Sequence, residues 1–202
     1  MYIENKKSGI RINMLVPIGL VTVFLINGVI PSAVMLLAAF VHELGHLVCA
    51  TIVGAPILRF DVELWGGKML YGGMLSYKKE LIISLGGIAA NLLFAPLGMI
   101  PLFGVYGKLF YYSCFCYAII NFIPVRSLDG GEVLRCLLWS YTDPYTATKA
   151  QQAVHCLSVL FVIVSGLIVS LLSGFNSSVM FLVFFSVVVF VTDTKTQTKG
   201  PS

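Results

Sequence analysis

Residues 39–48 read AFVHELGHLV, and the His-Glu-x-x-His pattern within them limits what the chain can be. On a helix, His42 and His46 lie one turn apart on the same face, so both imidazoles can bind one metal ion. Glu43 lies between them and can act on a water held by that metal. The pattern predicts a catalytic zinc site. The alternative is a buried His/Glu hydrogen-bond cluster that holds helices together.

The motif lies inside an apolar run that is long enough to cross a bilayer. Between residues 32 and 54, His42, Glu43 and His46 are the only residues of the Asp, Glu, Lys, Arg and His types. Each such side chain at membrane depth costs about 2.5–3.5 kcal/mol on insertion scales, so it usually has a function. Three of them at metal-binding spacing make a chance cluster a weak explanation.

The composition is that of an integral membrane protein. Of the 202 residues, 58% are hydrophobic and 11% are charged, whereas soluble domains are nearer half apolar and a quarter charged. The net charge of +4 is small and arises from clustered basic residues, which disfavours nucleic-acid binding. The five cysteines include no C-x-x-C pair, so buried thiols are a better interpretation than disulfides.

We predict an all-α polytopic membrane protein that forms one membrane-embedded domain over residues 1–202. No signal-cleavage pattern follows the first apolar run, so we expect it to be retained as a helix. A polar tail is expected over residues 193–202. The six predicted spans cover residues 14–30, 32–54, 81–102, 109–124, 153–173 and 177–192.

The basic residues predict how these spans are oriented. With both termini on the inner face, all of the 13 Lys and Arg residues except Lys108 fall in inner segments. Cytoplasmic segments are enriched in Lys and Arg. We therefore expect both termini to be cytoplasmic.

A small membrane-associated β element is expected after the second span. Residues 58–64 alternate apolar and polar side chains, residues 65–67 read Trp-Gly-Gly as a turn, and residues 69–71 form a possible returning strand. An exposed strand edge there could pair with an extended peptide. An ordinary connecting loop over residues 58–71 is an equally good interpretation.

A catalytic zinc ion usually has three protein ligands and one open position, so the two histidines need a third. Asp129 is the best-placed candidate. It follows the fourth apolar run, which runs in the same direction as the second, and Gly130-Gly131 after it permit tight turns. The alternative is that Asp129 caps a helix over residues 130–141.

Three other residues are weaker candidates for the third ligand. His155 begins a later apolar helix and could lie within the membrane boundary. Asp143 and Asp193 lie in polar segments and look solvated.

Two motifs together resemble those of the site-2 protease family of intramembrane metalloproteases. They are HELGH at residues 42–46 and NFIPVRSLDGG at residues 121–131. The layout is most similar to the branch that includes stage IV sporulation protein FB, down to the Trp-Gly-Gly at residues 65–67 and the number of spans. The similarity covers nearly the whole chain, and the pair of motifs is more specific than either one alone.

The resemblance implies that His42, His46 and Asp129 bind one zinc ion per chain and that Glu43 is the catalytic acid and base. It also implies that Asn121 and Pro124 help to line the substrate cleft.

From this resemblance we expect a zinc-dependent endopeptidase that cuts within or near a transmembrane segment of a membrane-bound precursor, as in regulated intramembrane proteolysis. Substrates of this kind are anti-sigma factors, pro-sigma factors and signal-peptide remnants, and sporulation is one process they serve. The expected surroundings are the bacterial cytoplasmic membrane, its lipids and regulatory membrane proteins, without nucleic acid.

The chain departs from the family pattern at two positions. Gly87 is followed by Ile88 where the family commonly has Pro, and Ser127 stands where relatives often have Pro. Neither position is a ligand, so the differences concern packing and substrate choice. Some members also carry a carboxy-terminal CBS domain, and we expect its regulation to be absent here.

The competing class of function is a non-catalytic metal-binding transporter or scaffold that uses the same ligands. A transporter would more often place polar residues along a path through several spans. Here the polar groups concentrate at one depth, around the HELGH motif.

Overall fold

The computed structural model describes residues 2–4, 10–13, 15–63 and 66–172. These form two compact units, Met1–Asn121 and Phe122–Ser202, which are described separately. The predicted span over residues 177–192 and the polar tail over residues 193–202 lie outside the described residues. The single membrane-embedded domain stays a prediction.

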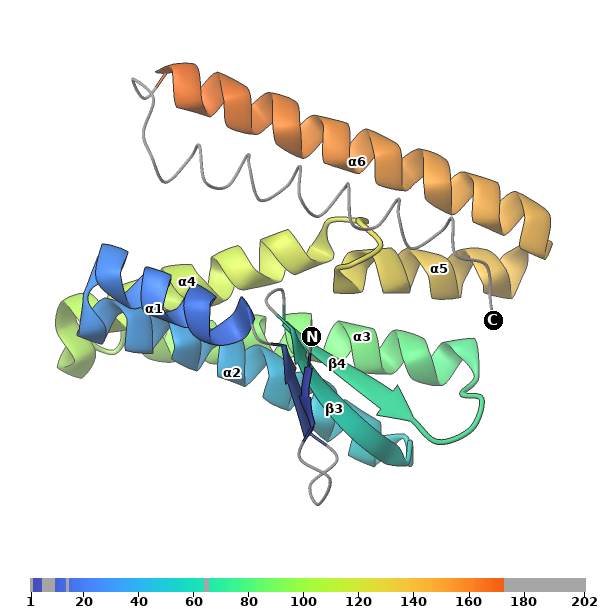
Figure 1. Ribbon diagram of the computed structural model, residues 1–202, viewed down its shortest axis with the longest axis horizontal. Helices are drawn as coiled ribbons and strands as arrows, with labels where there is room; N and C mark the ends of the chain where they lie inside the picture. Colours follow the sequence, from blue (N-terminus) through green and yellow to red (C-terminus); the bar gives the residue numbers. More distant parts are fainter. Residues whose placement is uncertain (1, 5–9, 14, 64–65, 173–202) are drawn as a thin grey trace. The chain divides into compact units, whose positions relative to one another are not determined.

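The helices of the first unit are α1 (Leu15–Asn27), α2 (Val29–Ile52), α3 (Tyr77–Phe94) and α4 (Gly104–Phe122) (Figure 1). The last residue of α4, Phe122, already belongs to the second unit. Two 3₁₀ turns, Ala95–Met99 and Pro101–Phe103, connect α3 to α4. The second unit contains α5 (Asp129–Tyr141) and α6 (Pro144–Leu172), which pack against each other.

Of the described helical segments, three are long and apolar enough to cross a membrane: Val29–Ile52, Tyr77–Met99 and Pro144–Leu172. They correspond to the second, third and fifth predicted spans. Large apolar side chains are exposed along them, including Phe40 and Phe161, as expected for surfaces that face lipid. The chain is therefore a membrane protein.

The helix that carries the HELGH motif begins earlier than the sequence suggested. The second span was predicted to begin at residue 32, just after Pro31, but α2 begins at Val29, after Gly28 at a φ of 81°. Proline is compatible with the first turn of a helix because the N–H it lacks would have no partner there. The Ser32 hydroxyl donates back to the carbonyl oxygen of Gly28 at 2.6 Å.

The expectation of an all-α protein is wrong for two short segments near the amino terminus, which form strands. β1 (Tyr2–Glu4) and β2 (Ile10–Asn13) join β3 (Ile57–Glu63) and β4 (Gly66–Tyr71) in a four-stranded sheet of order β1-β2-β3-β4. The β3–β4 hairpin follows α2, as predicted (Figure 1). β2 pairs with β3 in parallel, and this non-local partner supplies hydrogen bonds that a three- or four-residue pattern does not reveal.

Glycines allow α2 and α3 to cross closely. A Cβ added at Gly45 would lie 2.6 Å from the Cβ of Ala90, and one added at Gly86 would lie 2.6 Å from the sulfur of Cys49. Small residues at such crossings let two helix backbones approach each other in a membrane. The crossing places α3 directly against the face of α2 that carries the histidines.

Candidate metal centre

The histidine pair lies on the buried face of α2. His42 is 4% exposed and His46 is 8% exposed. Their Nε2 atoms face each other at 3.1 Å, and the two rings meet edge to face. This is the predicted arrangement of residues i and i+4 on one helical face.

The pair fits a zinc ion. Two nitrogens bound to tetrahedral zinc at about 2.0–2.1 Å are roughly 3.3 Å apart, close to the 3.1 Å between the two Nε2 atoms. The tautomer of His46 also suits metal binding, because its Nδ1–H donates to the carbonyl oxygen of Ile83 at 2.8 Å. That hydrogen bond leaves the lone pair on His46 Nε2 for a metal.

The Glu43 carboxylate is held by the start of β4. Its Oε1 accepts a hydrogen bond of 2.9 Å from the backbone N–H of Gly67. A Cβ added at Gly67 would lie 2.8 Å from Cε2 of Phe60 and 2.5 Å from Oε2 of Glu43. Only glycine therefore fits here without displacing the carboxylate. The sequence showed Gly67 as part of a turn and gave no sign of this contact.

Two residues of α3 face the histidine pair, and the sequence did not assign either of them to the site. Gly87 leaves room for the imidazoles: an added Cβ would lie 2.8 Å from Cε1 of His42 and 2.7 Å from Cε1 of His46. One turn later, the fully buried Asn91 places its Nδ2 3.3 Å from Nδ1 of His42. On α4, the Tyr117 ring lies 6.0 Å from the His42 ring.

We predict that Gly87→Ala weakens zinc binding about 10–100-fold, the scale seen when ligand orientation is lost. The new methyl group overlaps both rings and must push them apart. Zinc affinity of the purified protein, measured by competition with a chromogenic chelator, tests this. Ala89→Val adds bulk at an exposed position of the same helix and is the control. Unchanged affinity in Gly87→Ala would contradict the geometry.

In the second unit, a tight turn fixes the position of Asp129. Asp129 is the first residue of α5, and the N-cap position is Leu128, so the alternative that Asp129 is the N-cap is wrong. A Cβ added at Gly130 or Gly131 would lie within 3.0 Å of the backbone of Phe122 or Val125, respectively. Both glycines are therefore required for the turn that delivers Asp129.

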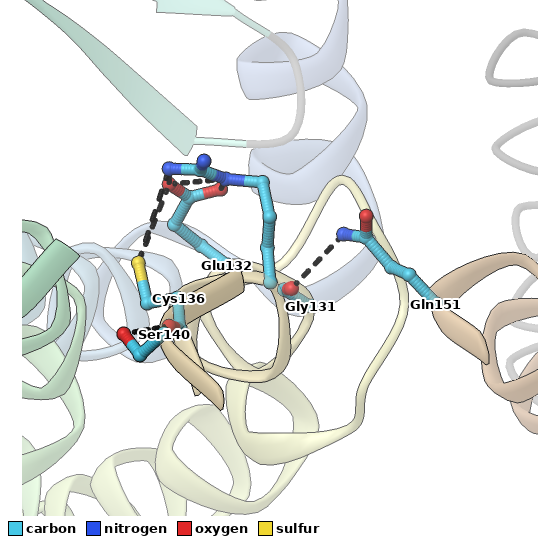
Figure 2. A network of polar contacts seen from close by, with 6 residues as sticks. Gly131, Glu132, Cys136, Ser140 and Gln151 are labelled. Atoms are coloured by element: carbon cyan, nitrogen blue, oxygen red, sulfur yellow. Dashed lines mark hydrogen bonds and ion pairs between the residues drawn. The ribbon is translucent and has the colours of Figure 1, made fainter. Parts of the chain in front are cut away.

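α6 holds this turn from one side. The backbone N–H of Arg126 donates to Nδ1 of His155 at 3.2 Å. Gln151 Nε2 donates to the carbonyl oxygen of Gly131 at 3.4 Å (Figure 2). His155, an alternative metal ligand in the sequence, thus uses one ring nitrogen to support the Asp129 turn.

The remaining acidic candidates have other surroundings. Asp143 is exposed and accepts a hydrogen bond of 2.9 Å from the backbone N–H of Thr146. Hydrogen bonds from Thr146 lower the pKa of Asp143 below its usual value, and this contact places Asp143 at the start of α6. Asp193 lies outside the described residues.

The structure gives positions for Asn121 and Pro124, the two residues expected to line the substrate cleft. Asn121 lies near the end of α4, where its Nδ2 donates to the carbonyl oxygen of Tyr117 at 3.0 Å. Pro124 lies in the turn between α4 and α5. Their contact with substrate stays a prediction, as does the ligand role of Asp129.

Comparison with known proteins gives relatives in sequence and in structure. No family model matches the chain. A proposed zinc metalloprotease of Synechocystis sp. is 29% identical over an alignment of 136 positions, which covers 58% of this chain and 33% of that protein. The chain thus spans about a third of that relative's length.

The solved structure of a site-2 protease from Methanocaldococcus jannaschii superposes with a TM-score of 0.60. The match has 20% sequence identity and covers 95% of this chain and 93% of that one. At this identity, the likeness concerns the fold.

Proposed function

We propose that this chain, which has the fold of the site-2 proteases, is an intramembrane zinc metalloprotease. The observation that carries the proposal is the buried His42–His46 pair, with its Nε2 atoms 3.1 Å apart, on a helix that is apolar and long enough to span a membrane. Glu43 lies between the two histidines, where the His-Glu-x-x-His pattern places the general base.

When bound, zinc would polarise the scissile carbonyl group and make the attacking water more acidic. Glu43 takes the proton from that water and transfers it to the leaving nitrogen. The N–H of Gly67 holds Oε1 of Glu43, so the carboxylate is oriented before the substrate arrives. The His46–Ile83 hydrogen bond does the same for one ligand.

Asp129 is our proposed third ligand, which gives one zinc ion per chain. The support comes from the pairing of HELGH with NFIPVRSLDGG and from the tight turn that starts α5 at Asp129. A carboxylate is a common third ligand beside two histidines in zinc peptidases.

The hairpin suggests how the substrate is held. β4 lies at an edge of the sheet, and its residue Gly67 contacts Glu43. An extended peptide that adds to the β4 edge would run past the catalytic carboxylate. A substrate helix must unwind to bind in this way, and Asn121 and Pro124 are proposed to line the same cleft.

The proposed substrate is a membrane-anchored precursor cut within or near its transmembrane segment. Six spans with both termini in the cytoplasm follow from the apolar runs and from the distribution of Lys and Arg. The resemblance to the sporulation branch favours a bacterial cytoplasmic membrane, with a pro-sigma or anti-sigma factor as substrate and other membrane proteins as regulators.

Metal removal tests the proposal. The purified chain, reconstituted into liposomes with a tagged single-span peptide, is expected to cleave the peptide. 1,10-Phenanthroline should abolish cleavage and added zinc should restore it, because the chemistry requires the metal. Zinc binding without cleavage of any of a panel of single-span peptides would instead favour a metal-binding scaffold or transporter.

A further inference from the structure

Asn91 on α3 is a completely buried amide whose nitrogen has a hydrogen-bond partner and whose oxygen has none among the described residues. Its Nδ2 lies 3.3 Å from Nδ1 of His42. Among the described residues, no group donates to its buried Oδ1. An acceptor left without a donor at membrane depth is unfavourable, so an arrangement that gives this oxygen a donor would be more stable.

With the amide in its present orientation, its contact with His42 implies one placement of the imidazole hydrogens. Because Nδ2 donates to Nδ1 of His42, the imidazole hydrogen of neutral His42 is on Nε2. That Nε2–H then donates to Nε2 of His46 at 3.1 Å. This chain of hydrogen bonds is consistent, but it occupies both Nε2 atoms, and a nitrogen that carries a hydrogen does not bind a metal.

Zinc ligation requires a different tautomer of His42. Both Nε2 lone pairs must point at the metal, so the His42 hydrogen must move to Nδ1 and find an acceptor there. Metal-binding histidines almost always donate their other N–H to an oxygen in this way. His46 already does so through Ile83, and Asn91 is the neighbour in position to do it for His42.

We propose that Asn91 is a positioning residue for the metal centre and that its amide turns over when zinc binds. A half-turn about the Cβ–Cγ bond exchanges Oδ1 and Nδ2, which are nearly the same size. Oδ1 then accepts the Nδ1–H of His42, and Nε2 of His42 becomes a ligand. The hydrogen moves within one imidazole through solvent, so the step has no net loss of a proton.

This inference rests on the proposed function, which supplies the metal, and it is tested by binding rather than by cleavage. We would measure the zinc affinity of the detergent-purified full chain by chelator competition and record the visible absorption of its cobalt form. Asn91→Leu removes the acceptor at similar volume, whereas Asn91→Asp keeps an acceptor oxygen. Ser84→Ala removes another buried polar group from α3 and is the control.

Asn91→Leu is expected to bind zinc about 10–100-fold more weakly than wild type, with a weaker or shifted cobalt spectrum. Asn91→Asp and Ser84→Ala should keep affinities close to wild type. Rescue by Asp would separate a hydrogen-bonding role from a packing role.

Equal weakening in Asn91→Leu and Asn91→Asp would overturn the proposal, as would unchanged affinity in a folded Asn91→Leu protein that elutes as wild type does. The two levels of inference remain distinguishable. If wild type binds no zinc, the proposed function fails and this inference fails with it. If wild type binds zinc and cleaves, but Asn91→Leu matches it, only the role of Asn91 fails.

Discussion

Glu43→Gln is expected to keep zinc bound while cleavage of a membrane substrate falls about 10²–10⁴-fold, the usual contribution of a general acid–base group. That loss corresponds to about 3–5 kcal/mol of transition-state stabilisation. The Gln amide keeps the size of the side chain and an oxygen for the N–H of Gly67, which donates to Glu43 Oε1 at 2.9 Å. It cannot take a proton from water.

The measurement is a pair of readings on the same preparation: zinc content and the rate of peptide cleavage in liposomes. Glu80→Gln makes the same substitution in the first turn of α3, where the proposed mechanism assigns no role, and should leave both readings unchanged. Cleavage at the wild-type rate by Glu43→Gln would exclude the hydrolase mechanism. Loss of zinc from Glu43→Gln would show that Glu43 is a ligand.

The histidine pair could be predicted from sequence because its geometry is local. Residues four apart on a helix share a face, and α2 places His42 and His46 together without help from any other element. The hairpin was predicted for a similar reason, since residues 58–64 alternate and β3 covers Ile57–Glu63. Local periodicity is present in the sequence itself.

The groups that surround the pair were not predicted because they depend on packing between distant segments. Gly67 contacts Glu43 across 24 positions, and Asn91 contacts His42 across 49. The sequence assigned neither Gly67 nor Asn91 to the site. The strands β1 and β2 were missed for the same reason, because their pairing with β3 is non-local.

In the second unit, the sequence left the role of each candidate side chain open. Asp129 and His155 were both candidate ligands. His155 accepts the N–H of Arg126 at 3.2 Å, so it already has a structural task in the turn before Asp129. The tight packing of Gly130 and Gly131 against the backbone explains why the motif needs both glycines.

Asp129→Ala should therefore cost more zinc affinity than the roughly 10–100-fold expected when a residue that only orients a ligand is removed. With Asp129 gone, two imidazoles remain, and they do not make a closed three-ligand site. His155→Ala should keep most of the zinc affinity, because it loosens the turn without removing a ligand. The zinc affinities of the Asp129→Ala and His155→Ala variants are to be compared by chelator competition.

Asp143→Ala is the matched control, since it makes the same change at an exposed carboxylate that caps the start of α6. Wild-type affinity in Asp129→Ala together with a large loss in His155→Ala would reverse the assignment and make His155 the third ligand. The opposite pattern would assign Asp129 to the metal and His155 to the turn. Because both residues belong to the same unit and His155 supports the turn before Asp129, a loss that is equal in both variants would point to the turn itself as the element that zinc binding requires.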